Sequence, residues 1–172
     1  AVMAGMYAVY HGPEGLKFIA DGVHNTASTL SEYLSKLGFN QVNTSYFDTL
    51  RIKTDAKKIK KIAKEKKVNF FYPDDETVTI SINETTSRRD INYILSVFAE
   101  SAEKETLVIP SLSESNNISK SIQRTTDFLT LDVFNSYHSE TELMRYIKSL
   151  ERKDLSLNHS MISLGSCTMK LN

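Results

Sequence analysis

The stretch GPEGLKFIADGVHNTASTLSEYLSKLGF, residues 12–39, decides the fold of the chain around it. Gly12 and Pro13 predict the start of a helix, because proline is favoured at the first helical position. Gly38 predicts a left-handed cap at the other end, with Phe39 packing back on the helix. The apolar residues between them recur at helical spacing: Leu16, Ile19, Ala20, Val23, Ala27, Leu30, Leu34 and Leu37. We therefore expect a helix over about 14–37.

Three stretches that follow this helix predict a small sheet. Residues 44–53 end in alternating apolar and polar side chains, which is typical of a strand. VNFFYP, residues 68–73, predicts a short buried strand. TVTISIN, residues 77–83, alternates Val78, Ile80 and Ile82 with hydroxyl side chains and predicts a half-buried strand.

Two more helices complete this part of the chain. Residues 55–67 carry seven lysines around an apolar stripe of Ile59, Ile62 and Ala63. Ser87 and Asp90 resemble a capping box, and apolar residues at helical spacing follow them. The order of elements predicts an α+β (α/β two-layer) fold, a three-stranded sheet with helices on one face. We assign this domain to residues 1–104.

The composition changes after Lys104. LVIPSLSESNNISKSIQRTTDFLT is rich in Ser, Asn and Thr without a sustained period, so 105–135 is expected to be an extended linker. Ser139, with Glu142 three residues on, predicts the start of another helix. Its apolar stripe would be Leu143, Tyr146, Ile147 and Leu150. Residues 136–172 are therefore expected to form a C-terminal helix and loop.

Charge and composition exclude several classes of protein. The chain has 172 residues with 21 basic and 21 acidic side chains, which argues against a general binder of polyanions. The lysines of 57–67 fit a solvated helix face better than a nucleic-acid site, because no aromatics alternate with them. No apolar run approaches the roughly 20 residues that span a membrane. AVMAGMYAVYHG looks like the middle of a helix, so we expect a piece of a longer protein.

The most reactive side chains lie in MISLGSCTMKLN, residues 161–172, where Gly165 precedes Ser166, Cys167 and Thr168. Cys167 would need a positioned base to act as a nucleophile, and Lys170 does not stand at a diagnostic spacing. The alternative is a small residue packed under a tight turn, and the residues alone favour it. The four histidines show no spacing typical of zinc ligands, so no metal site is expected.

Four segments, in order, carry a resemblance to a known family: YAVYHGPEGLKFIA, HSETE, RYIKSLERKDLSL and LGSCTMKLN. The chain resembles the P-protein family of the glycine cleavage system. The resemblance implies a longer enzyme of two homologous halves, each similar to fold-type-I pyridoxal-phosphate enzymes. Residues 1–104 would be the small domain that closes the N-terminal half, followed by the connector and the first segment of the C-terminal half.

The resemblance also implies a chemistry. The family decarboxylates glycine on pyridoxal phosphate and passes the aminomethyl group to the lipoyl arm of the H-protein. The resemblance further implies a homodimer, located in the bacterial cytoplasm or in the mitochondrial matrix. Its cofactor lysine lies in a His-Lys motif, and no His-Lys dipeptide occurs here. We therefore expect no Schiff-base lysine, and no catalytic residue, among these 172 residues, and a chain that alone binds no cofactor.

By the same resemblance, a loop near cofactor and substrate comprises Gly165, Ser166, Cys167, Thr168 and Lys170, with His138 and Glu140 as secondary candidates. We expect no nucleic acid and no membrane as partners. A different class of function stays open beside the enzyme segment. A free-standing α+β domain could be an interaction or regulatory module without catalysis.

Overall fold

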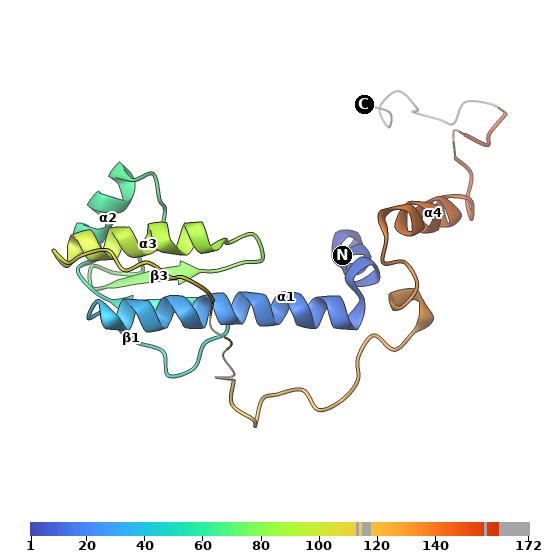
Figure 1. Ribbon diagram of the computed structural model, residues 1–172. Coiled ribbons are helices and arrows are strands. Elements are labelled where there is room, and N and C mark those ends of the chain that lie inside the picture. The colour runs from blue at the N-terminus through green and yellow to red at the C-terminus, as the bar shows by residue number, and fades with distance from the viewer. Residues whose placement is uncertain (113, 115–117, 157, 162–172) are drawn as a thin grey trace. The chain divides into compact units, whose positions relative to one another are not determined.

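The computed structural model describes residues 1–112, 114, 118–156 and 158–161. They form two compact units, each described here by itself: a sheet unit, residues 17–125, and a terminal unit, residues 1–16 together with 126–172. Figure 1 shows the elements. In chain order these are α1 (Val2–Lys36), β1 (Asn40–Gln41), β2 (Thr49–Lys53), α2 (Ala56–Glu65), β3 (Thr77–Ser81), α3 (Arg88–Ser101), a 3-10 turn (Asp132–Phe134) and α4 (Glu140–Glu151). No helix among the described residues is both long and apolar enough to cross a membrane.

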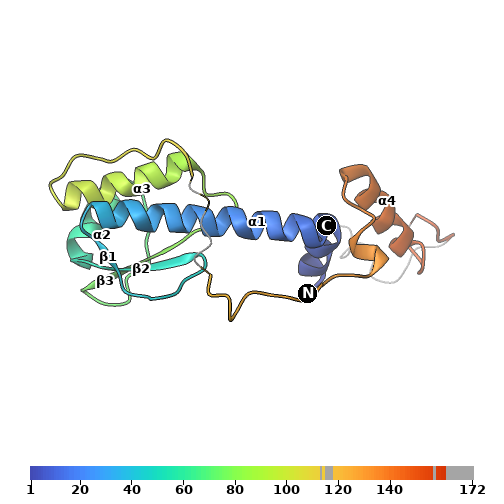
Figure 2. The ribbon, with the colours of Figure 1, turned by 60° about the horizontal axis from the view of Figure 1, so that its bottom comes forward.

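The sheet has three antiparallel strands in the order β1-β2-β3. Leu50 lies opposite Ile80 and Ile52 opposite Val78, and all four side chains are buried. Alternate residues such as Arg51 point to the other face and stay partly exposed, because successive side chains of a strand alternate. Helices therefore cover one face only, where α1 and α3 run along the sheet (Figures 1 and 2). The predicted α+β fold is confirmed.

The core of the sheet unit joins all three of its helices to the strands. Leu30 and Leu34 of α1, Ile59 of α2, and Leu95 and Phe98 of α3 are fully buried in one hydrophobic cluster with the inner strand residues. These are the positions that the helical spacing selected from the sequence. A stripe repeating every three to four residues is therefore what holds each helix on the sheet.

The third strand is not the predicted one. Residues 68–73 form no strand, and only Phe71 makes an isolated bridge, to Thr79. Phe71 is 68% exposed, so the prediction of a buried strand was wrong. Pro73 has no N–H to continue a ladder, and the Asp74 carboxylate turns the chain by accepting from the Glu76 amide at 2.9 Å. The third strand is instead β1, which directly follows the end of α1.

The bounds predicted for the helix over 14–37 agree with the part of α1 that follows Gly12, although α1 itself begins earlier, at Val2. Gly12 has non-helical backbone angles, φ 62° and ψ −176°, so Pro13 begins a second helical stretch that ends at Lys36. Gly38 has φ 95°, and its N–H donates to Ser35 O at 2.9 Å. The Phe39 N–H donates to Leu34 O at 2.9 Å, which completes a Schellman cap and turns the chain into β1.

Local caps also set the starts of the other helices. The predicted capping boxes Ser87–Asp90 and Ser139–Glu142 are both present, with each side chain and backbone amide paired reciprocally. Hydrogen bonds from the Ser87 hydroxyl and amide hold the pKa of Asp90 below its usual value. The Asp55 carboxylate caps α2 by accepting from the Lys58 amide at 3.0 Å.

The lysine-rich helix α2 lies with its charges outward. Its predicted stripe is buried, together with Ala56. Lys57 pairs with Asp75 at 2.6 Å, Lys58 with Glu103 at 3.2 Å and Lys66 with Glu100 at 2.9 Å. These exposed pairs add little stability individually, but they neutralise part of the basic surface. The geometry is that of a solvated helix face.

The first residues of the predicted linker lie on the sheet unit. Ile109 is buried in its core, and the Ile109 N–H donates to Asn92 Oδ1 at 2.7 Å. The Arg88 guanidinium donates to the Pro110 carbonyl. The Lys104 ammonium donates to Leu37 O at 2.7 Å, at the C-terminal end of α1, where a cation is favoured. The domain boundary at residue 104 stays a prediction.

Gly22→Ala is expected to stabilise the sheet unit by about 1 kcal/mol, because glycine is the weaker helix former by that amount. Gly22 lies inside α1, and a Cβ there would have no atom within 4 Å. Urea unfolding followed by circular dichroism measures the change. Gly38→Ala, at φ +95°, is the matched control and should destabilise. A lower stability for Gly22→Ala would contradict the assigned environment.

Candidate functional site

The predicted loop Gly165, Ser166, Cys167, Thr168 and Lys170 lies outside the described residues, and its role stays a prediction. Its two secondary candidates are described. His138 directly precedes the cap of α4, and Glu140 is the first residue of that helix. An exposed acid in the first helical turn is favoured by the helix dipole, which is a sufficient structural reason for Glu140. His138 has a more specific environment.

His138 lies against the break in α1, at Gly12. A Cβ placed on Gly12 would stand 2.5 Å from His138 Cε1 and 2.7 Å from the Phe134 carbonyl oxygen. Both separations are too short for a real Cβ, so only glycine permits this approach. The backbone angles of Gly12 also fall in a region that is essentially confined to glycine. Two independent constraints, one conformational and one steric, therefore require glycine at position 12.

A hydrogen bond fixes the imidazole of His138. Its Nδ1 lies 2.8 Å from the carbonyl oxygen of Tyr10, a residue 128 positions earlier in the chain. A carbonyl only accepts, so Nδ1 carries the proton in this contact. In the neutral ring Nε2 then keeps its lone pair and is the acceptor. The contact thus determines which nitrogen of His138 is available to a further donor.

The chain approaches His138 through a short, locally bonded segment. Asn135 Nδ2 donates to Leu129 O at 2.9 Å and to Leu131 O at 3.0 Å, which closes the 3-10 turn. The Ser136 hydroxyl donates to Asp132 O at 2.6 Å. After the histidine, the capping box of α4 begins at once. His138 is therefore held from both sides by local hydrogen bonds.

Aromatic rings flank the same segment of α1. The rings of Tyr7 and His11 have centroids 4.3 Å apart, and those of Tyr10 and His11 are 5.1 Å apart. Tyr137 stacks on Tyr146 of α4 with centroids 4.3 Å apart. Sequence reasoning missed Tyr10 and Gly12 as site residues. The Gly-Pro dipeptide predicted only a helix start, although the same glycine allows the close contact with His138.

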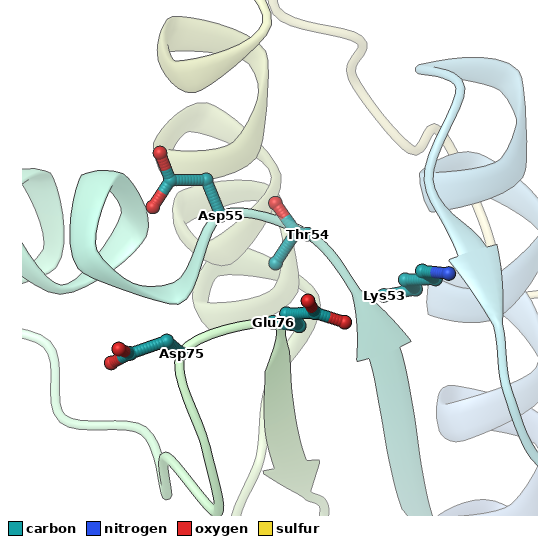
Figure 3. Close-up of a pocket in the computed structure, with 5 residues that line it drawn as sticks. All are labelled: Lys53, Thr54, Asp55, Asp75 and Glu76. Carbon is teal, nitrogen blue, oxygen red and sulfur yellow. The ribbon is translucent and has the colours of Figure 1, made fainter.

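A shallow cavity of about 470 Å³ on the sheet unit is lined by Lys53, Thr54, Asp55, Asp75 and Glu76 (Figure 3). Its carboxylates point in different directions (Figure 3). Asp55 caps α2 and Asp75 pairs with Lys57, so both have structural partners. Among the described residues no group of three His, Cys, Asp or Glu side chains fits a metal ion. We assign no ligand to this cavity.

Comparison with known proteins identifies the family. Residues 1–98 match the family model described as the glycine cleavage system P-protein. The chain belongs to the P-protein family. Over all 172 residues it is 63% identical to the glycine dehydrogenases (decarboxylating) of Flavobacterium johnsoniae and Christiangramia forsetii. A mitochondrial glycine dehydrogenase (decarboxylating) of Solanum tuberosum is 48% identical over 176 aligned residues, which cover the whole chain.

This P-protein chain spans about 18% of the length of the curated relatives it matches. The family resemblance inferred from the sequence motifs is thereby confirmed. Because the alignments cover the whole chain, they include both the sheet unit and the terminal unit with the Gly12–His138 contact. A match of this kind favours a segment of an enzyme over a free-standing interaction module.

Proposed function

We propose that residues 1–172 are a segment of a pyridoxal-phosphate-dependent glycine decarboxylase of the glycine cleavage system. The observation that carries this proposal is the 63% identity, along the whole chain, to proteins named glycine dehydrogenase (decarboxylating). The whole enzyme would decarboxylate glycine and transfer the aminomethyl group to the lipoyl arm of the H-protein. It would act as a homodimer, in the cytoplasm of a bacterium or the mitochondrial matrix of a eukaryote.

The cavity on the sheet unit does not resemble a pyridoxal phosphate site. Its lining includes three acidic side chains, Asp55, Asp75 and Glu76, against one basic side chain, Lys53, and this net negative charge would repel the cofactor's phosphate. The sequence contains no His-Lys dipeptide to supply the cofactor lysine. When bound to the whole enzyme, the cofactor would withdraw electrons from the substrate as carbon dioxide leaves.

The chain's own contribution would be to hold a substrate-side loop. Gly165, Ser166, Cys167, Thr168 and Lys170 follow α4 in the sequence, and the Tyr10–His138 hydrogen bond anchors the residue that precedes the cap of that helix. Small residues let a backbone approach an anion, and hydroxyls and amide N–H groups donate to it. We propose this role for the loop, with His138 as a residue that positions the helix preceding the loop in the sequence.

A replacement experiment tests the proposal. In the Flavobacterium johnsoniae relative, the aligned segment is exchanged for these 172 residues, and glycine-dependent carbon dioxide release is measured with lipoylated H-protein. We expect release from the chimera. We expect none from the 172-residue chain alone, and no cofactor absorbance specific to it. A chimera that folds and binds pyridoxal phosphate but leaves glycine unchanged would overturn the proposal.

Ser166→Ala and Thr168→Val in this chimera test the loop. Losing one donor to a developing charge typically lowers turnover about a hundredfold, or about 3 kcal/mol. The unfolding temperature should not change. Thr44→Val, at an exposed position of the sheet unit, is the control and should leave turnover as it is. If both loop variants keep full turnover, the loop has a structural role only.

A further inference from the structure

The terminal unit has almost no core of its own. Among its described residues Val9 is the one buried hydrophobic side chain, and none of the described residues of α4 is buried. Leu143, Tyr146 and Leu150 of the predicted stripe are half-buried, and Tyr146 stacks on Tyr137. Ile147, at one edge of the stripe, is 46% exposed, and the adjoining Met144 is 63% exposed. An amphipathic helix draws most of its stability from packing this stripe. No residue of the stripe is fully buried, so its packing among the described residues is incomplete.

Apolar exposure extends beyond α4 in the same unit. The large exposed hydrophobic residues there are Val2, Met3, Tyr7, Leu131, Met144, Ile147, Leu155 and Met161. Soluble proteins rarely leave large apolar patches uncovered unless the patch is an interaction site. With 12 residues, α4 is short enough to be marginal as an isolated helix in water. Both the exposed apolar residues and the short length of α4 indicate that another surface packs against the stripe.

The charges of α4 indicate which kind of surface could cover its apolar stripe. Glu140, Glu142 and Glu151 slightly outnumber Arg145 and Lys148. A helix that binds an anionic membrane surface carries a basic polar face, which α4 does not. The curated relatives are more than five times as long as the matched segment, since it covers 18% of them. Polypeptide on the same chain has a high effective concentration, which favours it over a separate partner.

We propose that the apolar stripe of α4 (Leu143, Tyr146, Ile147 and Leu150) packs intramolecularly against a part of the longer P-protein polypeptide that lies outside residues 1–172. This inference rests on the proposal that the chain is a segment of that enzyme. The docked stripe would hold α4 in place, in addition to the Tyr10–His138 hydrogen bond before the helix.

Cysteine labelling tests the docked face. Ile147→Cys places a thiol in the stripe, and Arg145→Cys places one on the opposite face of the same helix; both native side chains are exposed here. Each variant is made in the 172-residue chain and in the full-length chimera, and Cys167 is left in place. Maleimide labelling is followed at the substituted residue by peptide mass spectrometry, so other cysteines of the chimera do not interfere.

We expect both thiols to react at similar rates in the 172-residue chain. In the chimera the thiol at position 147 should react more slowly by about tenfold or more, because it must wait for local opening, while that at 145 is unchanged. Equal rates at 147 in both proteins would overturn the proposal. If labelling at position 147 of the 172-residue chain slows as the protein concentration rises, the proposal would also be overturned. A second copy of the chain would then be what covers the stripe. Labelling needs no catalysis, so an inactive chimera with a protected thiol rejects only the proposed function.

Discussion

Phe98→Ala is expected to lower the free energy of unfolding of the sheet unit by about 3–5 kcal/mol, the usual cost of truncating a buried phenylalanine. The Phe98 side chain is fully buried in α3. Its ring centroid lies 5.1 Å from that of Phe39 in an edge-on arrangement and 5.8 Å from that of Phe70. The truncation would remove the apolar burial and leave a cavity between α3, the end of α1 and the segment after α2.

Urea unfolding followed by circular dichroism measures this loss. Phe18→Ala is the matched control, because Phe18 lies on α1 with 81% of its surface exposed. The control should change stability by less than about 0.5 kcal/mol. If Phe98→Ala does not fold, Phe98→Leu keeps part of the volume and should show a smaller loss in the same direction. Equal effects at positions 98 and 18 would mean that the core is assigned wrongly.

The elements that the sequence predicted well are those with local causes. The Schellman cap at Gly38 needs only a glycine and the preceding turn, and the boxes at Ser87 and Ser139 need an acid three residues on. The stripes of α1, α2 and α3 were correct because burial follows the 3.6-residue repeat. Each of these features can be recognised in a window of a few residues.

The strands were harder because pairing is not local. Residues 68–73 have the apolar composition of a strand, yet only Phe71 pairs with Thr79. Asn40 and Gln41 have no strand signature, but the cap at Gly38 delivers them to the edge of β2, where they pair with Lys53 and Ile52. Which segment reaches the sheet edge depends on where the preceding helix ends, not on the segment's own composition.

The same limit applies to the candidate site. His138 and Glu140 were selected because the motif HSETE resembles the family, and nothing near them in sequence indicated Gly12. The Tyr10–His138 hydrogen bond joins residues 128 positions apart. A single sequence contains no signal for such a contact, although the glycine that permits it is visible. The fold brings together the helix break at Gly12 and the side chain of His138. From the sequence, Gly12 was explained as a helix start and His138 as part of the entry to another helix.

Gly12→Ala is expected to open the contact between the break in α1 and His138. The backbone region that Gly12 occupies costs a non-glycine residue about 1–3 kcal/mol. Overpacking typically costs about 1–3 kcal/mol more, and the new Cβ would overlap both His138 Cε1 and the Phe134 carbonyl oxygen. Movement of the His138 segment relieves only the overpacking, and that cost matches or exceeds the about 0.5–1.5 kcal/mol that one hydrogen bond contributes. The cheaper response is for His138 to leave Tyr10.

Proton NMR can detect this change directly. Since His138 Cε1 lies so close to Gly12, the Hε1 proton should show a nuclear Overhauser contact to the Gly12 α-protons in the native chain. In Gly12→Ala the contact of Hε1 with residue 12 should be lost. Gly5→Ala is the control on the same helix, because a Cβ there meets no atom within 4 Å, and it should keep the contact.

The stability of the sheet unit separates this local opening from general unfolding. Gly12 lies in the terminal unit, outside residues 17–125, so the urea midpoint of the sheet unit should be unchanged in Gly12→Ala. Retention of the Overhauser contact in that variant would show that the segment around His138 can shift to admit a methyl group, and that glycine is not required there. In the chimeric enzyme, loss of the contact should lower glycine turnover, because the segment that leads into α4 is then no longer anchored to Tyr10.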